Sequence, residues 1–275
     1  MRFLALLFAL SGSGCSSLLY YPDRTLHHEP AKIGLKPEEV YFESKAGPQL
    51  FAWYFRNRVG ERPRGVVVQF HGNGENLSSH YLSLAWVLDH GYDLLAFDYQ
   101  GYGRSEGTPS PEGTVRDGEA ALELAARRAG AGVPIHVYGQ SLGGAIALRT
   151  ILDNKGKYPV HSVVVEGSFA SYRRVARDVM SRAILTWPFQ WMAWIVMSDK
   201  HAPERDLEKL SPIPLLVIHG AKDSTIPLSL GENLFERSRP PKKMVIVPEG
   251  KHLDAHFLDQ GKWRKEVLAF WKGKP

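Results

Sequence analysis

Cysteine is nearly absent from this sequence: Cys15 is the only one among 275 residues, so no disulfide can form within the chain. The basic residues are scattered and the formal net charge is only +5, without the basic stripe that a nucleic-acid-binding surface needs. The sequence also lacks a Cys and His cluster for zinc, a G-x-x-x-x-G-K-S/T loop for nucleotide phosphates and a G-x-G-x-x-G loop for a dinucleotide. We therefore expect no nucleic acid as a partner, and no metal or cofactor.

The apolar run at the N-terminus, FLALLFAL (residues 3–10), is too short to span a bilayer. It follows a positively charged start and precedes small residues, a pattern typical of a cleaved secretory signal. Cys15 comes directly after the small residues, and this arrangement resembles the lipobox of bacterial lipoproteins, although Gly12 stands where Leu, Val or Ile is usual. The resemblance implies that residues 1–14 are a signal peptide and that Cys15 is diacylated. The protein would then be anchored to a membrane of the cell envelope, on the periplasmic side in a Gram-negative organism. The alternative is a secreted protein with an incidental cysteine.

Beyond the signal, the sequence predicts a tether and one folded domain. Residues 15–37 are rich in polar residues and proline and show no period, which is typical of a tether. Residues 38–275 alternate between short apolar strands and helices, the pattern of a mostly parallel sheet with helices on both faces. The first two strands are expected to form a hairpin, one helix is expected over about residues 78–90, and an amphipathic helix over residues 257–271 closes the chain. The predicted strands have the sequences EVYFES, LFAWYFRN, GVVVQF, DLLAFD, IHVYG, HSVVVEG, PLLVIHG and KMVIVPEG.

The most informative motif is the G-x-S-x-G sequence of residues 139–143, with Ser141 at its centre. The strand IHVY precedes it and a helix rich in small residues follows, which is the context of a nucleophile elbow. There the serine lies on a strained turn between strand and helix, and the free N–H groups of the helix N-terminus point at the charge formed during attack. An ordinary strand–Gly–helix turn is the alternative, and the flanking strand and helix favour the elbow.

A serine nucleophile needs a histidine base and an acid. In chains with a nucleophile elbow, the acid follows the serine in the sequence and the histidine follows the acid. His252 comes directly after the last predicted strand and is the preferred base; His256, four residues on, is expected to be an exposed helix residue. Asp223 follows the strand PLLVIHG and is the preferred acid, which would orient the imidazole. Glu166, at the end of another strand, is the rival. Asp254 is expected to serve in a turn or helix cap.

The oxyanion of an acyl-transfer reaction would be held by backbone N–H groups, one after the nucleophile and one in the loop after an earlier strand. These donors are predicted to be the N–H groups of Leu142 and Asn73. Asn73 lies in the sequence HGNG, whose glycines let the backbone come close to a reacting carbonyl. By itself HGNG could be a flexible turn, but it lies between a strand and a helix upstream of the elbow.

The motifs HGNGEN, DYQGYGRSEG, GQSLGG, HGAKDSTIP and GKHLD occur in an order and spacing that resemble the α/β-hydrolase superfamily, over about residues 40–271. They look most like its esterase, thioesterase and aminopeptidase-like branch, which includes membrane-associated depalmitoylating hydrolases. The resemblance implies an α/β-hydrolase fold. It gives the segment Asp98–Ser105 a structural role in shaping the loop behind the nucleophile.

About 45 residues separate the strands HSVVVEG and PLLVIHG, more than one crossover helix needs. This insert, about residues 168–205, follows the sixth strand, where the family resemblance implies a short helical element like a lid. Trp187, Trp191 and Trp194 are spaced as on one face of a helix, which Pro188 would begin and which would run over Phe189–Met197. Such spacing usually indicates core packing. The alternatives are the wall of an acyl pocket, to which we assign the three tryptophans, or contact with a membrane interface.

The sequence as a whole predicts a serine hydrolase that cleaves a carboxylic ester or thioester through an acyl-enzyme, with a small-molecule or lipid-like acyl substrate. A serine peptidase or aminopeptidase-like amidase is an alternative, because the same three residues can cleave amides. A membrane-tethered scaffold without catalysis is a third possibility, which the filled triad positions disfavour.

Overall fold

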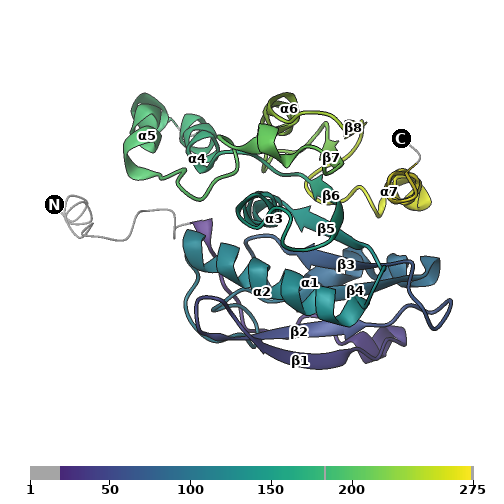
Figure 1. Ribbon diagram of the computed structural model, residues 1–275. Helices are drawn as coiled ribbons and strands as arrows, with labels where there is room; N and C mark the ends of the chain where they lie inside the picture. Colours follow the sequence, from purple (N-terminus) through teal and green to yellow (C-terminus); the bar gives the residue numbers. More distant parts are fainter. Residues whose placement is uncertain (1–18, 183, 274–275) are drawn as a thin grey trace.

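The computed structural model describes residues 19–182 and 184–273 of the chain. Its centre is an eight-stranded sheet with the order β1-β2-β4-β3-β5-β6-β7-β8 (Figure 1). β2 pairs antiparallel with both β1 and β4, and all the other neighbours are parallel, so the predicted hairpin and the mostly parallel sheet are both present. The strands are β1 (Glu38–Glu43), β2 (Gln49–Phe55), β3 (Gly65–Phe70), β4 (Tyr92–Phe97), β5 (Ile135–Gln140), β6 (Val160–Glu166), β7 (Leu215–Gly220) and β8 (Lys242–Val247).

The central strands carry continuous apolar runs because both faces of the sheet are covered. Every residue of β3, β4, β5 and β7 is buried. Successive side chains alternate between the faces: Val66 and Val68 belong to one core cluster and Val67 to the other. The first cluster includes residues of α2 (Pro111–Ala129), α3 (Leu142–Asp153) and α6 (Leu228–Arg237), and the second includes residues of α1 (Leu77–His80) and α7 (Arg264–Trp271).

The single helix expected over residues 78–90 is a wrong prediction. The chain forms the short α1 and then two 3₁₀ helices, Tyr81–Ser83 and Ala85–His90. Side chains occupy carbonyl groups that a continuous helix would use: Gln69 Nε2 donates to His80 O at 2.8 Å, and Trp86 Nε1 donates to Ser83 O at 2.8 Å. The closing helix is also shorter than expected, because Asp259 and Gln260 have positive φ and α7 begins only at Arg264.

The segment expected to be a tether lies against the domain from Tyr20 onwards. Tyr20 is buried, and its hydroxyl is 3.2 Å from Thr114 Oγ1 of α2. Further along, Gly103 N donates to Asp23 O at 2.8 Å, and His27 N donates to Ser78 Oγ at 3.0 Å. Cys15 and the predicted signal peptide lie outside the described residues. Within the described ranges, no helix is both long enough and apolar enough to cross a membrane.

Candidate active site

Ser141 lies on the sharp turn between β5 and α3, with φ 51° and ψ −121°. A non-glycine residue rarely adopts positive φ, so this strained conformation needs support from its surroundings. The support is close packing at the two flanking glycines. A Cβ on Gly143 would lie 2.2 Å from Phe70 O, and a Cβ on Gly139 would lie 2.5 Å from the Cα of Gly144. The glycines therefore let the turn pack against β3 and α3, as the nucleophile-elbow interpretation requires.

The structure brings Ser141, His252 and Asp223 together in one hydrogen-bonded chain. His252 Nε2 is 3.0 Å from Ser141 Oγ, and His252 Nδ1 is 2.7 Å from Asp223 Oδ2. Each side chain comes from a loop at the carboxyl end of a parallel strand: β5, β7 and β8. Because parallel strands end at the same edge of the sheet, residues far apart in sequence meet there.

The surroundings of Asp223 keep it ionised and fix the imidazole. Burial acts to raise the pKa of this carboxyl, but the hydrogen bond and charge of His252, with the Ile226 N–H group, bring its pKa below the usual value. Oδ1 accepts from the N–H groups of Thr225 at 2.9 Å and Ile226 at 2.8 Å. A carboxylate can only accept, so Nδ1 of His252 carries the proton of that bond and Nε2 offers its lone pair to Ser141.

His219 supports Asp223 from behind, a role that the sequence did not suggest. Its Nε2 is 2.8 Å from Ile226 O, which can only accept, and 3.7 Å from Asp223 Oδ2. Burial lowers the pKa of His219. The neutral ring therefore donates one hydrogen bond that holds the loop carrying Asp223. His219 and Asp223 are the first and last residues of the sequence HGAKD. This short separation across the end of a strand and a turn is the sequence signal that could have indicated their contact.

The two predicted oxyanion donors lie beside Ser141. Leu142 is the first residue of α3, so its N–H has no partner within the helix. Asn73 lies in the loop after β3 and is held through other atoms: its O accepts from Tyr21 N at 3.1 Å and from Tyr102 Oη at 2.8 Å, and its Nδ2 donates to Leu19 O at 3.2 Å. Both backbone N–H groups are thus available to a ligand, as far as the described residues show.

Glu166 and His256 form a separate buried group. Tyr138 Oη donates to Glu166 Oε2 at 2.9 Å and is 2.5 Å from His256 Nε2, while Ala255 N donates to Glu166 Oε1 at 3.3 Å. The expectation that His256 is exposed is wrong, because it is 1 % exposed and packs beside Trp86. Burial lowers the pKa of His256 to about 3 and raises that of Glu166. Glu166 therefore does not hold the acid's place beside His252.

Two further carboxylates, Asp254 and Asp98, hold loops in place through hydrogen bonds. Asp254 Oδ1 accepts from Lys251 N at 2.9 Å, which fits the expected turn role. Asp98 is buried, its Oδ1 accepts from Leu77 N at 2.7 Å, and its backbone O accepts from Ser105 Oγ at 2.8 Å. Burial raises the pKa of Asp98 to about 7. The first bond ties the loop that begins at Asp98 to the start of α1, and the second closes the loop on itself.

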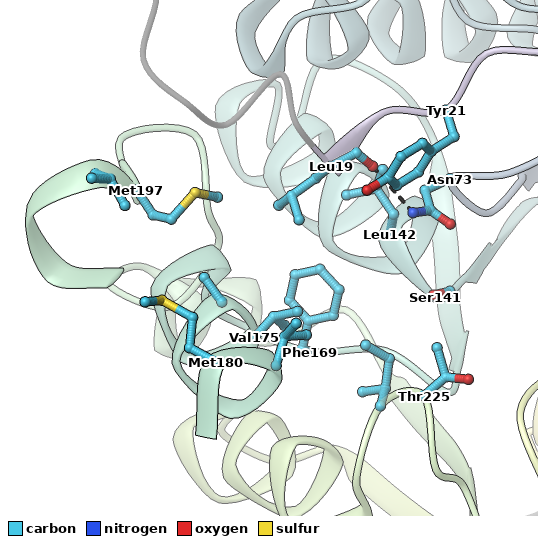
Figure 2. Close-up of a pocket in the computed structure, with 14 residues that line it drawn as sticks. Leu19, Tyr21, Asn73, Ser141, Leu142, Phe169, Val175, Met180, Met197 and Thr225 are labelled. Carbon is cyan, nitrogen blue, oxygen red and sulfur yellow. Dashed lines mark hydrogen bonds between the residues drawn. The ribbon is translucent and has the colours of Figure 1, made fainter. Parts of the chain in front are cut away.

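A cavity of about 470 Å³ begins at Ser141 (Figure 2). Asn73 and Leu142 lie at its polar end, and its other walls come from the start of the described chain, from α4 (Tyr172–Ser181) and from α5 (Ala193–Val196) with the residue after it. The side chains that form these walls are almost all apolar: Leu19, Phe169, Val175, Ala176, Val179, Met180, Val196, Met197 and Ile226. Its volume is in the usual range for a small-molecule site.

The structure contradicts the assignment of Trp187, Trp191 and Trp194 to this pocket, and equally the core alternative. None of them lines the cavity, and they are 60 %, 57 % and 42 % exposed. The spacing misled because residues Trp187–Met192 form a 3₁₀ helix and only Ala193–Val196 form an α-helix. With about three residues per turn, positions four apart no longer share a face. Of this segment, Ala193 and Met197 are buried, and Val196 and Met197 line the cavity.

No group of three or more His, Cys, Asp or Glu side chains with the arrangement of a metal site occurs in the part of the chain that the structure describes. The candidate site therefore consists of a serine, a histidine and a carboxylate at a strand edge, next to an apolar cavity.

Comparison with known proteins identifies the fold. An esterase from Pyrococcus furiosus superposes with a TM-score of 0.74 at 17 % identity, over 93 % of this chain and 98 % of that one. An esterase from a Rhodococcus species gives a TM-score of 0.62 at 18 % identity, over 86 % and 99 % of the two chains. At such identities the likeness shows the fold, and the predicted α/β-hydrolase fold is confirmed.

The family can also be stated. The family described as serine aminopeptidase, S33, matches residues 61–210. The uncharacterized protein YfhR of Salmonella typhi is 30 % identical over 251 residues, which are 86 % of this chain and 80 % of the relative. Human protein ABHD12B is 32 % identical over 207 residues, 67 % of this chain and 54 % of the relative. This chain belongs to the S33 family of α/β hydrolases.

Proposed function

We propose that this protein is a serine hydrolase that cleaves carboxylic esters or thioesters through an acyl-enzyme. The observation that carries the proposal is the apolar cavity that begins at Ser141. This serine is hydrogen-bonded to His252, which is hydrogen-bonded in turn to Asp223. The esterases among the structural neighbours share its fold, and the family is one of hydrolases.

In the proposed first step, Ser141 Oγ attacks the carbonyl carbon of the substrate and its proton passes to His252 Nε2. Asp223 stabilises the imidazolium that forms, and the N–H groups of Asn73 and Leu142 hold the oxyanion of the tetrahedral intermediate. The imidazolium then gives its proton to the leaving alcohol or thiol. This breaks the original bond and leaves the acyl group on Ser141.

In the second step, water replaces the leaving group. His252 takes a proton from the water as it attacks the acyl carbon, and the same proton returns to Ser141 Oγ when the acid is released. Each half of the reaction needs the imidazole once as base and once as acid. The 3.0 Å between Ser141 Oγ and His252 Nε2 suits proton transfer in both directions, and the 2.7 Å bond to Asp223 keeps the imidazole oriented throughout.

The cavity lining favours an acyl substrate over an aminoacyl one. An aminopeptidase has to bind the charged amino group of its substrate, which calls for a carboxylate or an equivalent set of acceptors. No Asp or Glu is among the described residues that line the cavity. Burying an ammonium group against methionine, valine and phenylalanine would leave its charge unpaired. The cavity is therefore suited to a neutral hydrocarbon chain.

The test is labelling with a fluorophosphonate probe, which reacts with activated serines. The wild-type chain should be labelled and Ser141→Ala should not, with an unchanged thermal unfolding temperature. Ser224→Ala is the matched control, because Ser224 is exposed in the loop next to Asp223. Labelling that persists in Ser141→Ala would overturn the assignment of the nucleophile.

A second measurement separates the ester and amide alternatives. p-Nitrophenyl acyl esters and aminoacyl p-nitroanilides are assayed side by side with the same preparation. Faster turnover of aminoacyl amides than of acyl esters would favour the amidase. Labelling of Ser141 with no turnover of either class would leave the substrate class proposed here without support.

A further inference from the structure

The insert after β6 presents an apolar surface to solvent. Side chains of one stretch, which we call the insert patch, are between 51 % and 92 % exposed although all are large and apolar: Ile184, Leu185, Trp187, Phe189, Trp191 and Ile195. Single exposed apolar residues are common in soluble proteins, but a contiguous group of this kind marks an interaction surface. Two of the six are tryptophans, which favour the boundary between water and hydrocarbon.

The insert patch adjoins the mouth of the cavity. Val196 and Met197, which follow directly on Ile195, line the cavity, and so do Val179 and Met180 of α4. Val179 is itself 55 % exposed, so apolar surface continues from the cavity wall to the outside of the insert. Figure 2 shows Met180 and Met197 at the end of the cavity away from Ser141. A hydrocarbon chain that leaves the cavity at this end meets the insert patch.

The described chain begins at this same mouth. Leu19 lines the cavity opposite Met180 and Met197 (Figure 2). Cys15 precedes Leu19 by four residues, which can span at most about 14 Å when extended. If Cys15 carries a lipid anchor, the mouth of the cavity is therefore held close to the membrane surface. The position of Leu19 is independent of the exposure of the insert patch, and both point to the same side of the molecule.

The charge of the insert suits an anionic surface. Residues 172–200 contain five Arg and Lys and two Asp, a net charge of +3. Arg177 is exposed beside the 3₁₀ helix, with its Nε 3.2 Å from Gln190 Oε1, and the guanidinium of Arg173 lies 5.9 Å from the ring centre of Trp194. Arginines around an apolar, Trp-containing surface are the composition of segments that lie in the interface of a membrane.

We propose that the insert patch docks on an anionic lipid bilayer, with its apolar side chains in the interfacial layer and the mouth of the cavity facing the lipid. This deepens the proposed function, because it makes the substrate class an acyl chain that enters directly from a membrane. The docking itself does not depend on catalysis. A second copy of the chain and a protein partner are the other possible occupants, and the experiment separates them from lipid.

The experiment measures quenching of tryptophan fluorescence by lipids brominated on their acyl chains. The full chain is mixed with vesicles of phosphatidylcholine and phosphatidylglycerol, with and without bromine. Bromine quenches only tryptophans that reach the acyl region, and the remaining tryptophans are in the domain: Trp53, Trp86, Trp263 and Trp271. Substantial quenching is expected in the wild-type chain. It should disappear when Trp187, Trp191 and Trp194 are all replaced by Phe, which keeps the surface apolar.

A second pair of variants tests whether the apolar surface drives docking. Leu185→Asp with Ile195→Asp places two charges on the insert patch and should reduce the quenching several-fold. Val59→Asp is the matched control, because Val59 is 57 % exposed in the loop before β3, at the other end of the sheet, and it should leave quenching unchanged. All these residues are exposed, so the substitutions should not unfold the domain.

The outcome is independent of the proposed function, because Ser141→Ala should dock as the wild type does. Absence of quenching in the wild type overturns the proposal. So does quenching that persists in the triple Phe variant, because it would then come from tryptophans of the domain. If the three tryptophans are protected from aqueous iodide without any bromine quenching, and the chain sediments as a dimer, the insert patch is covered by a second copy and the proposal is wrong.

Discussion

The apolar cavity at Ser141 leads to a quantitative prediction of acyl-chain preference. Each methylene group that moves from water into apolar surroundings contributes about 0.8 kcal/mol. When this energy is realised in the transition state it raises kcat/KM, by about fourfold for each methylene. A p-nitrophenyl hexanoate has four methylenes more than the acetate, so the wild type should hydrolyse it with a kcat/KM roughly 200-fold higher.

Ala176→Phe tests whether the cavity is the source of this preference. Ala176 lies on α4 and lines the cavity, so a phenyl ring there takes up space that the acyl chain needs. An acetyl group has no chain to place in that space, so the acetate should be hydrolysed almost as before. The hexanoate should lose the contribution of several methylenes, so its advantage over the acetate should fall by about tenfold or more.

Trp191→Ala is the matched control for this series. Its side chain is 57 % exposed and does not line the cavity, so the ratio of hexanoate to acetate kcat/KM with soluble esters should stay as in the wild type. The reasoning is refuted by a wild type without chain-length dependence, or by an Ala176→Phe variant that loses activity on both esters alike. A loss of the ratio in Trp191→Ala would return that residue to the pocket.

Three further perturbations test the site and its surroundings. Asp223→Asn should lower kcat by about 10^3 to 10^4, because the amide favours the wrong tautomer of His252, while Glu166→Gln should lower it far less; the reverse ranking in steady-state assays would exchange their roles. His256, with a pKa lowered to about 3, stays neutral in the folded protein while the unfolded chain binds a proton below about pH 6.5. The free energy of unfolding should therefore fall as pH drops from about 6.5 towards 3, by up to about 1.4 kcal/mol per pH unit from this residue. Urea unfolding should show a weaker dependence of this free energy on pH in His256→Asn than in the wild type. The same pH dependence in both would mean that His256 titrates normally. We also propose that Cys15 anchors the protein in the cell envelope: a palmitate analogue should label the wild type and not Cys15→Ser, and equal labelling would indicate an ordinary signal peptide.

Local sequence was sufficient for the elements that depend on backbone geometry. The turn at Ser141 needs small neighbours, and Gly139 and Gly143 stand where a Cβ would collide with other backbone atoms. Such a requirement can be recognised in the sequence, here as the G-x-S-x-G motif. The strands were also predictable, because a strand buried on both faces is mostly apolar, and β3, β4, β5 and β7 each carry an apolar run and are buried at every position.

The cavity walls could not be predicted in the same way. They combine Leu19, residues of α4 and residues at the end of α5, which share no motif and meet only in the folded chain. Leu19 belongs to residues 15–37, whose polar and proline-rich composition suggested a tether. Tyr20 of the same segment is nevertheless buried against α2. The tryptophans of the insert were misplaced because periodicity assumed an α-helix where a 3₁₀ helix forms.

The choice between the two strand-end carboxylates shows what sequence position leaves open. Asp223 follows the parallel strand β7 and Glu166 ends the parallel strand β6, so position alone favours neither. Their surroundings differ: Asp223 faces the imidazole of His252 and accepts two backbone N–H groups, and its pKa is lowered despite burial. Burial raises the pKa of Glu166, whose hydrogen-bond partners are the Tyr138 hydroxyl, the Gln140 side chain and the Ala255 N–H group. A base that becomes positively charged during the reaction needs a carboxylate within hydrogen-bond reach, and of the two carboxyls only Asp223 is hydrogen-bonded to His252.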